Sequence, residues 1–150
     1  MRRRAYVADL TRLGALSEGN YHRMSRLLKL AAGSDTLRID LHNGRQYLGR
    51  VQFRLLQRAR YTDTWYLEQL HNQGRWLNNP RMTVRSYHDA NLTEVISCYR
   101  HRRIEPVSDY PNRFMHHPDE KIQINAFLAD WLGFCLRFGH VDDLEPVWER

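Results

Sequence analysis

The sequence has only two cysteines, Cys98 and Cys135, and they stand far apart in the chain. This spacing excludes both a disulfide framework and a CxxC motif of the zinc-binding or redox type. Because free cysteine is among the most buried residue types, we expect two buried, reduced thiols.

The chain also lacks a long apolar run, and no segment approaches the roughly 18 apolar residues of a membrane-spanning helix. The basic residues 1–4 resemble the start of a secretory signal, but Asp9, Arg12 and Glu18 interrupt the apolar segment that should follow. We therefore expect a cytoplasmic protein without membrane contact.

The common catalytic motifs are missing as well. There is no phosphate-binding glycine loop, no GxSxG elbow, no dinucleotide-binding fingerprint and no HExxH pair. The His116 to Glu120 segment holds histidines and carboxylates, but its spacing fits no metal site and its charges suit a helix start. We expect no metal and no cofactor, and the sequence leaves open whether the protein is an enzyme.

Lysine is rare, since Lys29 and Lys121 are the only lysines among 23 basic residues. Residues 1–74 hold 13 basic against 6 acidic residues, a balance of +7, whereas residues 75–150 hold 10 against 11. Arginine suits bidentate contacts with phosphate or carboxylate better than lysine does. The basic first half therefore favours an anionic partner.

With 150 residues, 42% of them hydrophobic and 27% charged, the chain has the size and composition of one globular domain. We expect a single α+β domain over residues 1–150, with flexible ends at the basic start and at residues 141–150. Helical spacing predicts two short N-terminal helices, over residues 6–16 and 18–32. Ser17 would cap the second, and Gly33 would end it.

The pattern then changes to period two, which predicts an antiparallel meander of about five strands. Leu37, Ile39 and Leu41 alternate with polar residues, and Asn43-Gly44 predicts a type I′ hairpin turn. The returning strand would place Tyr47, Val51, Phe53 and Leu55 on one face. Further strands are expected at 64–71, 81–88 and 92–100.

A long C-terminal helix is predicted between Pro118 and Gly139. Its wide apolar stripe should pack on one face of the sheet. The stripe consists of Ile124, Phe127, Leu128, Trp131, Leu132, Cys135 and Phe138.

The leading candidate site is a row of arginines on the polar face of the second strand. Arg50, Arg54 and Arg58 would share that face, with Arg60 just beyond, at intervals of about 13 Å. Such a row could follow the phosphates of RNA, with Tyr66 or Tyr87 stacking on bases. The alternative is a solvated face whose arginines pair with acidic residues.

A second candidate is a pocket between the sheet and the C-terminal helix, where an enzyme or nucleotide binder could act. A histidine beside a carboxylate can serve as a base, although residues 89–91 also have the composition of a plain turn. Asn125 could instead have a purely architectural role. The pocket candidates are Tyr87, His88, Asp89, Glu94, Asp109, Tyr110 and Asn125.

Three functions therefore remain open. The leading hypothesis is a non-catalytic protein that binds RNA or a ribonucleoprotein through the basic sheet face. The alternatives are an enzyme or small-molecule binder and a protein-interaction adaptor with Trp76 and Leu77 as an exposed anchor.

Several strings in the second half of the chain resemble the YqiB-like proteins of gammaproteobacteria. They are RMTVRSYHDA at 81–90, EV at 94–95, DYPN at 109–112 and DEKIQINAFLADWL at 119–132. The resemblance extends over about residues 21–138 and leaves out the two ends. These are small uncharacterised proteins, so the resemblance implies kinship and no particular activity, and its strings do not include the arginine row.

Overall fold

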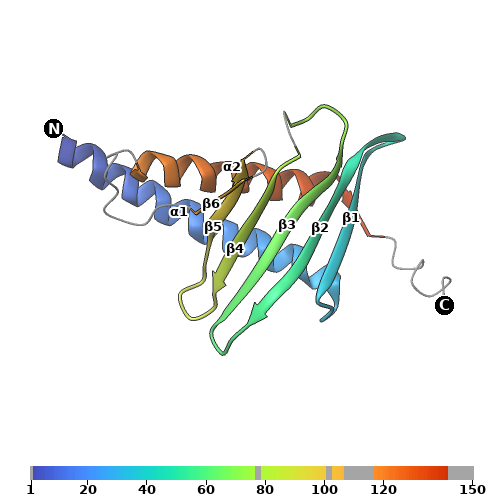
Figure 1. Ribbon diagram of the computed structural model, residues 1–150, viewed down its shortest axis with the longest axis horizontal. Coiled ribbons are helices and arrows are strands. Elements are labelled where there is room, and N and C mark those ends of the chain that lie inside the picture. Colours follow the sequence, from blue (N-terminus) through green and yellow to red (C-terminus); the bar gives the residue numbers. More distant parts are fainter. Residues whose placement is uncertain (1, 77–78, 101–102, 107–116, 142–150) are drawn as a thin grey trace.

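The fold is α+β, as predicted. In the part of the chain that the structure describes, two helices lie side by side across one face of an antiparallel sheet (Figure 1). It is seen in a computed structural model that describes residues 2–76, 79–100, 103–106 and 117–141. We call the sheet face under the helices the inner face. The other is the outer face, and no helix of the described residues covers it.

The first helix, α1, spans Arg2–Leu28 as one element, so the prediction of two short helices is wrong. Ser17 lies inside this helix and is 3% exposed. A serine favours a helix start without forcing one, and no proline interrupts the segment. The short 3-10 turn η1 (Lys29–Ala31) follows, and Gly33 takes a φ of +86° just after it.

Within the described residues, six strands follow one another as an antiparallel meander, one more than predicted. They are β1 (Thr36–Asn43), β2 (Gln46–Arg58), β3 (Thr62–Asn72), β4 (Arg81–Tyr87), β5 (Leu92–Arg100) and β6 (Arg103–Pro106). A two-residue strand, β7 (Gly139–His140), pairs with β1 and completes the order β6-β5-β4-β3-β2-β1-β7.

The predicted hairpin between β1 and β2 is present, but its turn is displaced by one residue. Asn43 pairs with Gln46, so the two-residue loop consists of Gly44 and Arg45. Gly44 has a φ of +64°, and glycine at the first loop position is typical of a type II′ turn. Asn43 remains in the strand, which is why the predicted type I′ turn does not form.

A register shift near this turn moves one predicted core residue to the other face. His42 pairs with Tyr47, whereas Leu41 pairs with Gly49, so Leu48 is the extra residue. Tyr47 therefore lies on the outer face beside His42, with ring centroids 5.3 Å apart, and the prediction that it joins Val51 and Phe53 is wrong.

A second shift, at the far end of β2, changes the face of a predicted site residue. Leu55 pairs with Trp65 and Gln57 with Thr64, so Leu56 is an extra residue in a β-bulge. Arg58 then pairs with Asp63 on the inner face, while Arg54 stays on the outer face. The prediction that the two arginines share a face is wrong because strict alternation fails at Leu56.

The second helix, α2 (His117–Phe138), contains Pro118 in its first turn and ends just before Gly139. A side chain at position 139 would collide with the Cys135 carbonyl and with Ile39, so the tight passage into β7 requires glycine. The predicted apolar stripe packs into the core. Its fully buried members are Leu128, Trp131, Leu132 and Cys135, which meet Leu37, Ile39, Leu41, Val51, Phe53, Leu67, Met82 and Val84.

Both cysteines are free and buried, as expected, and burial raises the pKa of Cys135 to about 12. Among the described helices, neither α1 nor α2 combines the length and the apolar character needed to cross a bilayer.

Candidate functional site

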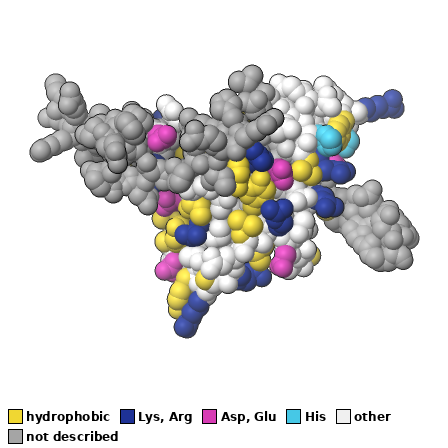
Figure 2. Space-filling view, in the orientation of Figure 1, with side chains coloured by type: hydrophobic (Ala, Val, Ile, Leu, Met, Phe, Trp, Pro, Cys, Tyr) yellow, Lys and Arg dark blue, Asp and Glu magenta, His cyan; other side chains and the backbone are white. Residues whose placement is uncertain are grey.

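The outer face of the sheet is a mixed surface rather than a uniformly basic one. Figure 2 shows apolar, basic and acidic side chains interspersed on it. By register, its charged residues are Arg38, Arg50, Arg54, Arg81 and Arg85 together with Asp40, Glu68 and Glu94. Opposite charges at such short spacing favour local pairing over one continuous positive field.

The four arginines of the predicted row are in four different environments. Arg50 donates from Nε to Asp40 Oδ1 over 2.6 Å and from Nη2 to Oδ2 over 3.3 Å, which is a bidentate ion pair. Arg54 lies on the outer face and Arg58 on the inner face. Arg60 is exposed in the turn after β2, 5.1 Å from the Tyr61 ring centroid. The four side chains therefore do not form one continuous row.

Four side chains of the outer face contact one another. We call them the arginine–tyrosine cluster, which consists of Arg54, Tyr66, Arg81 and Tyr99. Arg54 lies over the Tyr66 ring at 4.9 Å, and Arg81 lies over the Tyr99 ring at 4.6 Å. The two tyrosine rings meet edge to face, 5.8 Å apart. The cluster crosses four neighbouring strands, from β2 to β5.

In the Arg54–Tyr66 pair of this cluster the tyrosine is buried and the arginine is exposed, whereas Arg81 and Tyr99 are both half-buried. Tyr66 is 8% exposed, and its burial, followed by the charge of Glu68, raises its pKa above the ordinary value of 10.0. The guanidinium group of Arg54 is exposed above it. Sequence reasoning named Arg54 and Tyr66 but missed Arg81 and Tyr99, because only strand order places β4 beside β3 and β5 beside β4.

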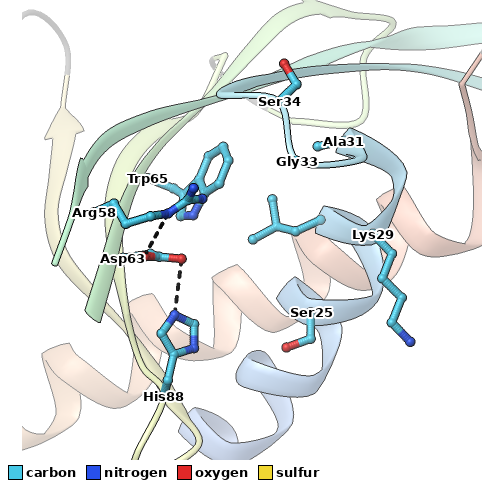
Figure 3. A pocket seen from close by; sticks show the side chains of 10 residues that line it. Ser25, Lys29, Ala31, Gly33, Ser34, Arg58, Asp63, Trp65 and His88 are labelled. Atoms are coloured by element: carbon cyan, nitrogen blue, oxygen red, sulfur yellow. Dashed lines mark ion pairs between the residues drawn. The ribbon is translucent and has the colours of Figure 1, made fainter. Parts of the chain in front are cut away.

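A cavity of about 290 Å³ lies on the inner face, where the C-terminal end of α1 meets the ends of β2, β3 and β4 (Figure 3). Arg58, Asp63 and Trp65 project from the sheet toward the helical segment, and His88 points at Asp63. We call this cavity the helix-end pocket. Its walls are Ser25, Leu28, Lys29, Ala31, Gly33, Ser34, Arg58, Asp63, Trp65 and His88.

A chain of polar contacts passes along one wall of the helix-end pocket. Arg58 Nε lies 3.4 Å from Asp63 Oδ1, and His88 Nε2 lies 3.1 Å from Asp63 Oδ2. Tyr21 Oη and His88 Nδ1 are 3.0 Å apart. When Nε2 of His88 is protonated and donates to Asp63, the unprotonated Nδ1 accepts a hydrogen bond from Tyr21. One neutral tautomer of His88 therefore satisfies both contacts.

Of the predicted pocket residues that the structure describes, only His88 lines the helix-end pocket, which lies at α1 and not at the C-terminal helix. Tyr87 ends β4 on the outer face, the same face as Tyr66, and Asp89 lies in the exposed turn. Glu94 approaches Lys121 Nζ at 3.9 Å. Asp109 and Tyr110 lie outside the described residues.

Asn125 is fully buried and has an architectural role. Its Oδ1 accepts from the Val95 amide over 3.1 Å, and its Nδ2 donates to the Lys121 carbonyl over 2.8 Å. Asn20 Nδ2 donates to the Asn125 carbonyl over 3.1 Å. Asn125 therefore ties α2 to both α1 and β5 and does not reach the helix-end pocket.

Sequence reasoning did not assign Tyr21, Asp63, Lys29 or Trp65 to a pocket. Tyr21 lies in α1, Lys29 lies in η1, and both Asp63 and Trp65 belong to β3. Their spacing in the sequence does not predict a shared site. The one signal in the sequence was the position of Asp63 within residues 61–64, the segment that separates the second predicted strand from the third.

Trp76, the proposed adaptor anchor, is partly buried against α2. Its ring centroid lies 5.0 Å from that of Phe127 and 5.9 Å from that of Phe134. Leu77 lies outside the described residues. Within the described part of the chain, no three His, Cys, Asp or Glu side chains gather closely enough to hold a metal ion.

The family of the chain follows from comparison with known proteins. A family model described as "Protein of unknown function (DUF1249)" matches residues 26–141. The chain belongs to this family. "Uncharacterized protein YqiB" from Escherichia coli K12 is 38% identical over 137 residues, which cover 89% of this chain and 93% of the relative, and the same holds for the protein of strain O157:H7. No solved structure matches the chain.

Membership of the family confirms the resemblance to YqiB-like proteins. The match includes the whole arginine–tyrosine cluster as well as Arg58, Asp63 and His88, whereas Tyr21 precedes it. The relatives' printed names assign no activity, so function has to be argued from the sites themselves.

Proposed function

We propose that this protein binds single-stranded RNA through the outer face of its sheet. The proposal depends on one observation, the arginine–tyrosine cluster on a face that no described helix covers. Arg54 and Arg81 lie over tyrosine rings, and these cation–π contacts hold each guanidinium group close to the sheet.

The chemistry of the cluster suits a single strand of RNA. A guanidinium plane can stack on an unpaired base, and its edge can donate two hydrogen bonds to a phosphate. The buried Tyr66 would support Arg54 from beneath rather than stack on a base itself. Because the guanidinium is already positioned, binding would cost less side-chain entropy than it does for a free surface arginine.

Arg50 should contribute less than Arg54, although both lie on the outer face. Asp40 engages Arg50 through two nitrogens, so a phosphate would compete with an existing bidentate pair. Among the described residues, no carboxylate pairs with Arg54. The proposed RNA surface is therefore centred on β3 and its neighbours instead of running along β2.

Fluorescence anisotropy with a labelled oligouridine tests the proposal. We expect binding that weakens as salt rises from about 50 to 200 mM, since phosphate contacts release counterions. The Arg54→Gln, Arg81→Gln double variant should lose about tenfold or more in affinity and show a smaller salt slope. Arg58→Gln is the matched control, because Arg58 belongs to the same strand but faces the other way.

Two outcomes would overturn the proposal. One is the absence of oligouridine binding at low salt. The other is an equal loss of affinity in the Arg58→Gln control, which would indicate non-specific charge attraction instead of a site on the outer face.

A further inference from the structure

The helix-end pocket combines positive charge with an apolar floor. Its cationic lining residues are Arg58 and Lys29, of which Lys29 points its ammonium group away from the other labelled side chains, and its carboxylate is Asp63 (Figure 3). Trp65 is 2% exposed and lies with Leu28 and Ala31 in the wall. Small-molecule sites typically have this composition, with apolar walls and a few placed polar groups.

Asp63 fixes Arg58 without using up its hydrogen-bonding capacity. The ion pair is made through Nε of Arg58, at 3.4 Å, and the side chain is 55% exposed. The terminal guanidinium nitrogens are the donors that commonly bind phosphate or carboxylate groups. An anion can therefore approach Arg58 while the contact with Asp63 persists.

Tyr21 and His88 hold Asp63 in a position that leaves Arg58 open to an anion. Asp63 is only 14% exposed and accepts from His88 Nε2, while Tyr21 holds the other ring nitrogen of His88. A carboxylate with two partners is less free to swing into the cavity and repel an anion there. The contact chain thus positions Asp63 at the wall.

We propose that the helix-end pocket binds a compact organic anion. Its phosphate or carboxylate group would meet Arg58 at the mouth, and its apolar part would lie against the wall formed by Leu28, Ala31 and Trp65. The volume of about 290 Å³ is at the lower end of typical ligand pockets, so the molecule is small. This site is separate from the proposed RNA surface, because it lies on the opposite face of the sheet.

Titration of the ¹⁵N-labelled full chain tests this site, with phenyl phosphate and benzoate as probes. The side-chain signals of Arg58 Nε and Trp65 Nε1 should shift together on binding. The two anions distinguish a phosphate site from a carboxylate site, and either one satisfies the proposal. Arg58→Gln should weaken binding about tenfold, whereas Arg38→Gln, on the outer face of β1, should leave it unchanged.

Two further probes make the result decisive. Inorganic phosphate should bind at least about tenfold more weakly than phenyl phosphate, since it lacks the part that lies on Trp65. Benzyl alcohol, which is neutral, should bind at least about tenfold more weakly than benzoate. Equal binding of either control probe, or no shift of the two side-chain signals with either anion, would overturn the proposal.

Discussion

Arg54 and Arg58 belong to the same strand, four residues apart, yet the fold uses them in opposite ways. Arg54 lies on the outer face over a tyrosine ring, and Arg58 lies on the inner face beside a carboxylate. The difference arises from one extra residue, Leu56, between the two positions. Identical residues at a spacing of four therefore need not share a face, because a single bulge reverses the alternation.

The same comparison extends to the two faces of the whole sheet. The inner face is buried beneath α1 and α2 and supplies the core, whereas the outer face holds paired charges and exposed guanidinium groups. Substitutions of the buried core residues on the inner face should therefore change stability, and those of the exposed arginines on the outer face should change RNA binding.

The largest contrast is expected between two neighbouring residues of β2. Phe53 is fully buried, so Phe53→Ala should lower the free energy of unfolding by about 3–5 kcal/mol. Arg54→Ala removes one contact with the Tyr66 ring, and at this exposed position we expect a loss of at most about 1 kcal/mol. Urea unfolding of both variants measures the two values, and similar losses would contradict the division between the faces.

Asn125 tests how firmly the inner face is tied to the helices. Asn125→Ala leaves the Val95 amide without its buried partner, so we expect a loss of about 1–3 kcal/mol. Chemical denaturation is the measurement. Gln123→Ala, at an exposed position of the same helix, is the matched control and should stay within about 0.5 kcal/mol.

Cys135 makes the inner face sensitive to alkaline pH. Its folded pKa of about 12 exceeds the ordinary value of 9.0, so the thiol ionises first in the unfolded chain. Its contribution is complete below pH 9 and falls as pH rises toward 12, at up to about 1.4 kcal/mol per pH unit. Unfolding measured across this range should show a shallower decline for Cys135→Ala than for the parent protein. Equal declines would exclude Cys135 as the cause.

The smallest effect is expected from deleting Leu56. The pairs on either side, Leu55 with Trp65 and Gln57 with Thr64, already continue the ladder across the bulge. Deletion should therefore regularise β2, leave Arg54 and Arg58 on their present faces and change stability by less than about 1 kcal/mol. Thermal unfolding measures the stability, and titration with phenyl phosphate measures the pocket. Loss of the pocket alone would indicate that the bulge shapes it directly.

Much of the fold could be predicted from periodicity. The sheet was predicted from the alternation of Leu37, Ile39 and Leu41, and its covering helix from the apolar stripe of α2. Both predictions succeeded because an element that buries one face repeats its apolar residues at a fixed local spacing. The N-terminal helix was divided wrongly at Ser17, since a capping residue is only a weak signal against the packing of a continuous helix. The candidate sites were predicted less well: Arg54, Tyr66 and His88 were found, while their partners were not.

The sequence by itself determined the fold class, the basic first half, the buried thiols and the family, because composition and local periodicity encode them directly. Only the tertiary structure decided which side chains meet. Arg81 and Tyr99 join Arg54 through strand order, and Asp63 joins His88 and Tyr21 through the end of α1. Such contacts depend on register, bulges and packing between distant segments, and one residue of slip in a strand exchanges its faces.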